Sequence, residues 1–582
     1  MAEHQDPAAS AASSSASTLI LLQISSRLLT FVLNQLLVRL VSPSVFGLAN
    51  IQLELLISTI LFVSRDAFRT ILIRNEPGSS ASSSKAVATS SRVRRGVSNS
   101  IHNISLLPIP IGFTLTAIAC TVYVRYISPL AMRSLPSFHV SIALYALGAL
   151  SELVYEPLII RAVRLGRPTW RVKAEGIAVL AKTISTIATI ILLPLFSTPS
   201  FIQSWVEDER STALLAFGIG QATYSIVTLL VLLLFFFREY GIAPTIDLYV
   251  PRSDPVSPPR YFDTPTLSLC ATMSSQGVLK HCLTEADKFA IAKYSSLEDQ
   301  GGYALASNYG SLVARILFQP VEETCRIVFS SELTQDGGER KRRVREMLGG
   351  LFKMHFLLGL VMVTFGGPLS KTFLYVMAGE RWALQTSAPD ILAAYTWYLP
   401  IMGLNGIVEG FVQSVARKEE IQRYNRVLFT ASATFIGGLV MSRSKVVEGL
   451  VGKTGLVWAN AVSLAVRAGW CWKFLRVYFG GDGELGAKAA LPGRITLAVL
   501  GSVAAVLRVA VPRTMPMDEQ LVSAAESGRI QALNLLAPTV GLTSGCLAVV
   551  VGSIVVFERK ALIKALRSLR GQPHETRKTK RS

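Results

Sequence analysis

The feature that most constrains this chain is the recurrence of apolar stretches, each about 20 residues long, along nearly its whole length. A helix of about 20 residues crosses the roughly 30 Å hydrocarbon core of a bilayer. The sequence therefore predicts an all-α polytopic membrane protein with about fourteen transmembrane helices. The expected spans are 18–41, 46–73, 100–124, 136–160, 174–196, 211–238, 266–294, 302–332, 347–378, 388–415, 422–442, 452–475, 492–512 and 532–557.

Composition agrees with a membrane location. The 582 residues are 50% hydrophobic and only 16% charged, whereas about a quarter of an average soluble domain is charged. The net charge of +20 lies largely in short loops, where basic residues orient a membrane protein. We therefore expect membrane lipids as surroundings and no nucleic-acid partner, since aromatic residues do not alternate with the basic ones.

Basic loops follow the even-numbered spans, which predicts that both termini face the cytosol. Two such loops contain Arg161, Arg164, Arg167, Arg171 and Lys173, and Arg340, Lys341, Arg342, Arg343 and Arg345. The tail ends with Lys578 and Lys580, which resemble a dilysine retrieval signal of the endoplasmic reticulum. The alternative is a tail that is merely basic. The first 18 residues lack the positive region of a cleaved signal peptide.

A proline-rich segment divides the predicted spans into groups of six. The expected organisation is a disordered cytosolic N-terminus (1–17), a first lobe (18–240), a cytosolic linker (241–265), a second lobe (266–480), two additional helices (481–557) and a basic cytosolic tail (558–582). Two pseudo-symmetric six-helix lobes are typical of alternating-access transporters. The spans 46–73, 266–294 and 302–332 carry many charges, so they are either amphipathic helices or the lining of a polar cavity.

Ionisable residues inside the spans are the candidate functional residues, because charge at bilayer depth is costly and marks functional cavities. Arginine donates two parallel hydrogen bonds to phosphate. The candidate ligands of a phosphorylated headgroup or glycan are Arg27, Asn34, Arg65, Arg69, Lys280, Lys288, Arg315 and Arg467. The candidates for a polar cavity, gating or ion coupling are Glu54, Glu152, Glu156, Glu285, Glu322, Glu323 and Glu409. The alternative is that these arginines form structural pairs with the glutamates.

Enzyme motifs are absent from the sequence. The Gly452-Lys453-Thr454 triplet lacks the upstream glycine of a phosphate-binding loop, because Val447 stands there. The six histidines have no metal-ligand spacing, and the six cysteines form no CxxC pair. No GxSxG nucleophile elbow is present. We therefore expect no catalytic residues, no metal and no cofactor.

Several blocks between about residue 20 and residue 475 resemble a known family. They include RLLTFVLN at 27–34, LFVSRDAFR at 61–69, ELVYEP at 152–157, NYGSLVAR at 308–315, FQPVEE at 318–323, NGIVE at 405–409 and KEEIQRYN at 418–425. These blocks resemble the eukaryotic oligosaccharide translocation proteins of the endoplasmic reticulum. That family belongs to the multidrug/oligosaccharidyl-lipid/polysaccharide exporter superfamily. Asp66 stands where the family often has glutamate, and the last two spans match only in hydropathy.

The resemblance implies a substrate and a location. It implies translocation of a dolichol-diphosphate-linked oligosaccharide from the cytosolic to the lumenal leaflet of the endoplasmic reticulum membrane, for protein N-glycosylation. The candidate arginines would bind the diphosphate during alternating access. The alternatives are an ion-coupled small-molecule exporter of the same fold and a non-transporting scaffold of the dolichol-linked pathway. The sequence leaves open the energy coupling, the glycan contacts and the oligomeric state.

Overall fold

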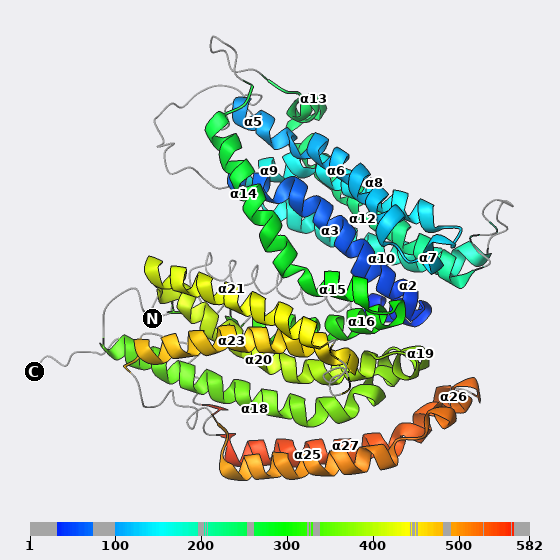
Figure 1. Cartoon of the computed structure of the whole chain (residues 1–582), viewed down its shortest axis with the longest axis vertical. Helices are drawn as coiled ribbons and strands as arrows, with labels where there is room; N and C mark the ends of the chain where they lie inside the picture. The colour runs from blue at the N-terminus through cyan, green and yellow to red at the C-terminus, as the bar shows by residue number, and fades with distance from the viewer. Residues whose placement is uncertain are drawn as a thin grey trace, which may run out of the picture. The chain divides into compact units, whose positions relative to one another are not determined.

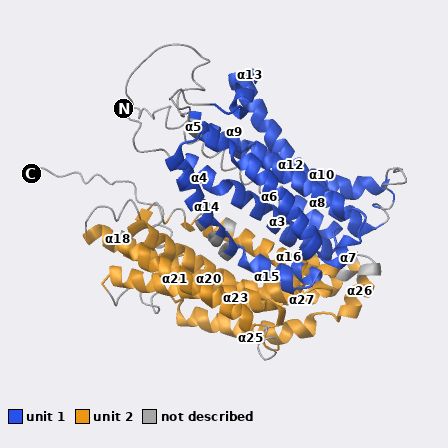
Figure 2. Cartoon of the chain, turned by 45° about the horizontal axis from the view of Figure 1, so that its top comes forward, with its two compact units in different colours: residues 1–300 blue, residues 301–582 orange. Residues whose placement is uncertain are grey.

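The computed structural model describes residues 32–73, 99–195, 208–252, 261–319, 338–442, 452–480, 491–527 and 529–559, with isolated positions between these ranges. Within these ranges the regular structure is entirely helical (Figure 1). The chain divides into two compact units, residues 1–300 and residues 301–582 (Figure 2). The expected all-α fold is confirmed.

The first helix in the described ranges that is long and apolar enough to cross a bilayer, here called the first span, runs from Pro43 to Ile73. This helix is continuous but irregular. Its parts are α2 (Pro43–Gly47), the π-helix η1 (Leu48–Leu53), α3 (Glu54–Leu61), the π-helix η2 (Phe62–Asp66) and α4 (Ala67–Ile73). Further α-helices of unit 1 are α5 (Asn99–Leu106), α6 (Pro108–Val122), α7 (Leu130–Arg133), α8 (Phe138–Val154), α9 (Glu156–Arg164), α10 (Thr169–Leu192), α12 (Glu209–Tyr240), α13 (Ile242–Ile246), α14 (Thr264–Thr284) and α15 (Ala286–Tyr294). Single-turn π segments inside helices frequently occur at functional sites.

Helix α16 (Leu297–Val313) crosses the boundary at residue 300 and continues as the π-helix η7 (Ala314–Phe318). The other helices of unit 2 are α18 (Gly338–Met377), α19 (Glu380–Leu384), α20 (Ala388–Val415), α21 (Lys418–Met441), α23 (Gly455–Tyr478), α25 (Arg494–Thr514), α26 (Asp518–Ser527) and α27 (Arg529–Phe557). The last two long helices, α25 and α27, pack together and against α18. Leu357 of α18, Leu500 and Leu507 of α25, and Val550 of α27 belong to one buried cluster.

Nine helices in the described ranges are long and apolar enough to cross a bilayer. They match nine of the predicted spans, namely 46–73, 100–124, 136–160, 174–196, 211–238, 347–378, 388–415, 492–512 and 532–557. Helices α14, α16, α21 and α23 occupy four further predicted spans but are not apolar enough to be counted. The predicted span 18–41 lies mostly outside the described residues. The polytopic architecture is therefore confirmed, whereas the number fourteen is not.

Close approaches at glycine hold the helices together in both units. A Cβ atom at Gly220 of α12 would lie 2.0 Å from Oγ1 of Thr186 in α10. A Cβ atom at Gly366 of α18 would lie 2.2 Å from Cγ2 of Thr396 in α20. Helices in a bilayer gain little from burying apolar surface, so packing of this kind between small residues is a main source of their association.

Helices α14 and α15 belong to unit 1, because α14 packs along η2 and α4 and α15 packs against η1. The stacking of the His281 ring on the Phe62 ring, with centroids 4.6 Å apart, illustrates this contact. The sequence assigns residues 266–300 to the second lobe. The boundaries of the two lobes stay a prediction, because segments that pack in one compact unit need not move together during transport.

Candidate functional site

An ion network lies inside unit 1, where the first span meets α8 and α9. Nη2 of Arg65 in η2 lies 3.0 Å from Oε2 of Glu152 in α8. Nη1 of the same guanidinium lies 3.6 Å from Oε2 of Glu156 at the start of α9. Arg69, one turn further along the span in α4, donates two hydrogen bonds to the two carboxylate oxygens of Glu156. Two arginines and two glutamates thus form one continuous network.

Burial of these charges makes the pairing necessary. The Glu156 side chain is fully buried, the Glu152 side chain is 6% exposed, and both arginine side chains are 16% exposed. An ionised side chain at this depth requires a partner of opposite charge, because the surroundings do not solvate it. The alternative of structural pairing is therefore realised for these two arginines. Whether they also bind a headgroup stays a prediction.

Polar side chains of α12 extend the network on the Glu152 side. Ser225 donates to Oε1 of Glu152 at 3.2 Å, and Nε2 of Gln221 lies 3.4 Å from the same oxygen. The Tyr155 hydroxyl donates to Oε2 at 3.0 Å. Lys182 of α10 donates to Oε1 of Gln221 at 2.7 Å, so it reaches Glu152 only through that amide. Lys182 thus joins the network as a third cation through Gln221.

Helical spacing explains how two arginines approach the same pair of carboxylates. Arg65 lies in η2 and Arg69 lies in α4. Residues four positions apart share one face of a helix, so both side chains project from the same side of the span. Glu152 and Glu156 are also four positions apart, one in the last turn of α8 and the other opening α9. Each helical segment therefore supplies two side chains of one charge sign to the network.

A second, smaller network lies inside unit 2. Nη2 of Arg467 in α23 lies 2.7 Å from Oε2 of Glu409 in α20. Asn405, one turn before Glu409, donates to the same oxygen at 2.7 Å, and Gln413, one turn after it, donates to Oε1 at 3.2 Å. The Glu409 side chain is 15% exposed and that of Arg467 is 30% exposed. Arg467 is therefore paired as well.

Other predicted residues have different surroundings. Lys288 and Glu285 form an ion pair of 2.8 Å on the α14–α15 segment. Glu54 lies on an exposed face of the first span, whereas Asn34 is only partly exposed. Glu322 lies beside α20, since a Cβ atom at Gly406 would be 2.8 Å from its Oε2. None of these residues belongs to the Arg65 or the Arg467 network in the contacts described above.

Several predicted residues cannot be compared with the structure. Arg27, Glu323, Lys578 and Lys580 lie outside the described residues, and for Lys280 and Arg315 only the backbone is described. Gln221 and Ser225 were not among the residues predicted from the sequence, and Asn405 appeared only within the NGIVE block at 405–409. A usable signal was present, because Gln221 and Ser225 are four positions apart in an otherwise apolar stretch and so share a helix face.

A solved structure shares this arrangement of helices. The lipid II flippase MurJ, in an inward closed conformation, superposes with a TM-score of 0.51 at 12% sequence identity. The match covers 93% of this chain and 99% of that chain. This likeness establishes the fold. Together with the buried ion networks, the fold defines the class as a polytopic helical membrane protein with a MurJ-like architecture.

The chain belongs to the Rft protein family, whose model matches residues 11–568. Curated relatives carry the name "Man(5)GlcNAc(2)-PP-dolichol translocation protein RFT1". The relative from Yarrowia lipolytica is 30% identical over 85% of this chain and 74% of its own length. The relative from Saccharomyces cerevisiae is 29% identical over 80% and 82%, and that from Xenopus tropicalis is 26% identical over 84% and 87%. The family resemblance read from the sequence blocks is confirmed.

Proposed function

We propose that this protein moves a dolichol-diphosphate-linked oligosaccharide from the cytosolic to the lumenal leaflet of the endoplasmic reticulum membrane, for protein N-glycosylation. The observation that carries the proposal is membership of the Rft family, whose curated members are named as translocation proteins of Man(5)GlcNAc(2)-PP-dolichol. The role is transport rather than catalysis. The MurJ-like fold supports it, because that neighbour is named a flippase of another diphosphate-linked lipid.

Arg65 is the residue we propose as the diphosphate ligand in unit 1. Its Nη1 is buried and makes no hydrogen bond within the described part of the chain, because Glu156 lies 3.6 Å away. A phosphate oxygen that approached this nitrogen would gain a charge-assisted hydrogen bond of the strong kind. Arg69 keeps Glu156 in place through two hydrogen bonds. In this mechanism Arg65 releases a carboxylate and binds the diphosphate of the substrate instead. The Arg69–Glu156 pair meanwhile keeps the span attached to α9.

Arg467 is the corresponding candidate in unit 2. Glu409 retains two amide donors, Asn405 and Gln413, when Arg467 moves away. The carboxylate would therefore remain partly satisfied during the exchange, which lowers its cost relative to that of an isolated buried charge. We propose that this exchange of partners couples substrate binding to helix movement.

The test is reconstitution of the full chain in vesicles with labelled Man(5)GlcNAc(2)-PP-dolichol. We expect the protein to increase the fraction of label that is accessible from the opposite leaflet. Arg65→Gln should abolish most of this increase, whereas Arg65→Lys should retain part of it because it keeps the charge but lacks the planar fork. Arg171→Gln is the matched control, since Arg171 pairs with Glu175 on the partly exposed surface of α10.

The alternative functions give different results in the same vesicles. An ion-coupled exporter would move small molecules only when an ion gradient is imposed, and Glu152, Glu156 and Glu409 would be the residues to test as proton carriers. A non-transporting scaffold would leave the label in its original leaflet, although cells that lack the protein would still under-glycosylate. Appearance of label in the opposite leaflet without an imposed ion gradient would support our proposal and would contradict both alternatives.

A further inference from the structure

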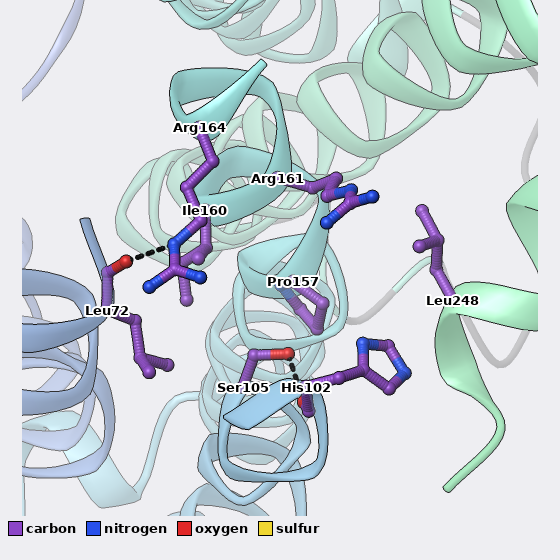
Figure 3. Close-up of a pocket in the computed structure, with 8 residues that line it drawn as sticks. All are labelled: Leu72, His102, Ser105, Pro157, Ile160, Arg161, Arg164 and Leu248. Carbon is purple, nitrogen blue, oxygen red and sulfur yellow. Dashed lines mark hydrogen bonds between the residues drawn. The ribbon is translucent and has the colours of Figure 1, made fainter. Parts of the chain in front are cut away.

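A small cavity in unit 1 has a lining that none of the functions above uses. It lies at the ends of α4, α5, α9 and the segment after α13 (Figure 3), and has a volume of about 30 Å³. The side chains that line it are Leu72, His102, Ser105, Pro157, Ile160, Arg161, Arg164 and Leu248. Two arginines, a histidine and a serine are therefore present, and no carboxylate is among the eight described lining residues.

Hydrogen bonding leaves part of this polar lining unsatisfied. Nε of Arg161 and Nε2 of His102 are buried and have no hydrogen-bond partner among the described residues. Figure 3 shows the Arg161 guanidinium and the His102 ring on the same side of Pro157 as Leu248. A buried Nε–H group of arginine without an acceptor is energetically unfavourable, because it loses its hydrogen bond to water and gains none in return. An acceptor group inside the cavity would remove this cost.

The neighbouring contacts hold the cavity in shape without filling it. Nε of Arg164 donates to the backbone carbonyl of Leu72 and so ties α9 to α4 (Figure 3). Asn103 donates to the carbonyls of Arg252 and Tyr261 and accepts from the amide of Arg252. The segment that carries Leu248 is thereby held against α5. These hydrogen bonds therefore fix the positions of the elements that surround the cavity.

The position of the cavity indicates its depth in the membrane. Leu72 is one residue before the end of the span Pro43–Ile73, His102 begins the span His102–Ile127, and Arg164 ends the span Phe138–Arg164. Three span ends therefore meet at the cavity, at the level where a bilayer changes from hydrocarbon to headgroups. Basic pockets between transmembrane helices at this level are suited to anionic lipid headgroups.

We propose that this cavity binds the phosphate group of an anionic membrane lipid, with Arg161 and His102 as its ligands. A phosphate has several acceptor oxygens and a negative charge, so it would accept a hydrogen bond from the unpaired Nε of Arg161 and compensate the charge of that guanidinium. The volume of about 30 Å³ admits only a compact group such as the tip of a headgroup. Free inorganic phosphate has the same chemistry, but the depth of the cavity favours a lipid as its source.

The test uses the full-length protein, purified in detergent and stripped of lipid. Binding of short-chain phosphatidic acid, short-chain phosphatidylcholine and inorganic phosphate is measured separately by calorimetry, and bound lipid is confirmed by native mass spectrometry. We expect phosphatidic acid to bind more tightly than the other two. Arg161→Gln should weaken this binding by about tenfold or more, since it removes a charge-assisted contact, and Arg161→Lys should have an intermediate effect.

Arg238→Gln is the matched control, because Arg238 is an exposed cation near the end of α12 that does not line the cavity. This variant should bind phosphatidic acid like the parent protein. Equal weakening by Arg161→Gln and Arg238→Gln, or no binding by the parent protein, would overturn the proposal. Tighter binding of inorganic phosphate would overturn the assignment to a lipid. If Arg161→Gln does not fold, the parent titration and the Arg161→Lys variant still decide the result.

Discussion

Arg69 and Glu156 lie 87 positions apart in the sequence, and their side chains meet through two hydrogen bonds inside unit 1. The pair joins the first membrane span to α9, and Arg65 joins the same span to the end of α8. Charge of both signs is tolerated at this depth because each member has its partner. The pairs consequently hold three helical segments in one arrangement.

Removal of one carboxylate from the network should lower the stability of the protein, because the arginines depend on it for pairing. Glu156→Gln leaves Arg69 without its ionic partner and weakens the environment of Arg65. Removal of one member of a buried pair typically destabilises by about 3–5 kcal/mol, because the remaining charge is left unpaired. We expect thermal denaturation in nanodiscs to show a clear fall in stability. The exchanged double variant, Arg69→Glu with Glu156→Arg, should recover part of the loss, and its failure to do so would argue against the pair as the cause.

Acid should weaken the attachment of α27 to α18. Glu558 follows the last span directly and lies 2.8 Å from Lys353. Burial raises the pKa of the Glu558 carboxyl, but the Lys353 contact and the backbone amide of Gly493 together lower it below its ordinary value of 4.5. A lowered folded-state pKa contributes stability above the unfolded-state value, and this stability is lost as the pH falls through the folded-state value.

The measurement for Glu558 is the melting temperature between about pH 7 and pH 3. Glu558→Gln should lower the melting temperature at pH 7 and should flatten the acid part of the curve. Lys371→Gln is a suitable comparison, because Lys371 pairs with the exposed Asp518 near the other end of α18. An unchanged acid dependence in the Glu558→Gln protein would assign the effect to other carboxylates.

The close approach of α18 and α20 predicts strong intolerance at Gly366. A Cβ atom there would meet the Thr396 side chain at 2.2 Å, which is well inside van der Waals contact. Overpacking of this kind costs about 1–3 kcal/mol or more. Gly366→Leu should therefore reduce the yield of folded protein in detergent, as measured by size-exclusion chromatography. Gly367→Leu is the control, since no neighbouring atom lies within 4 Å of a Cβ atom there.

Asn103 is expected to be a structural residue. Its side chain is 3% exposed and makes three hydrogen bonds to the backbone of Arg252 and Tyr261. Asn103→Ala should lower stability by about 1–3 kcal/mol, because buried backbone groups lose their partners. Limited proteolysis should then cleave more rapidly near residues 247–252. Unchanged proteolysis would show that this segment is held by other contacts.

The sequence predicted the helical spans of this protein well, because the property that defines them is local. Nine of the predicted spans coincide with helices that are long and apolar enough to cross a bilayer. Helices α14, α16, α21 and α23 lie at further predicted spans but carry more polar residues, so hydropathy alone does not settle their position in the membrane. The family was also readable from short blocks of sequence.

The sequence by itself determined that this chain is a helical membrane protein of the Rft family with ionisable residues in its spans, since length, hydropathy and short blocks need no knowledge of distant contacts. Only the tertiary structure decided which charges meet. Glu156 could have paired with any of the arginines, and the choice of Arg69 and Arg65 follows from how the first span packs against α9. The physical reason is that an ion pair depends on separations of a few ångströms between side chains that the sequence places far apart.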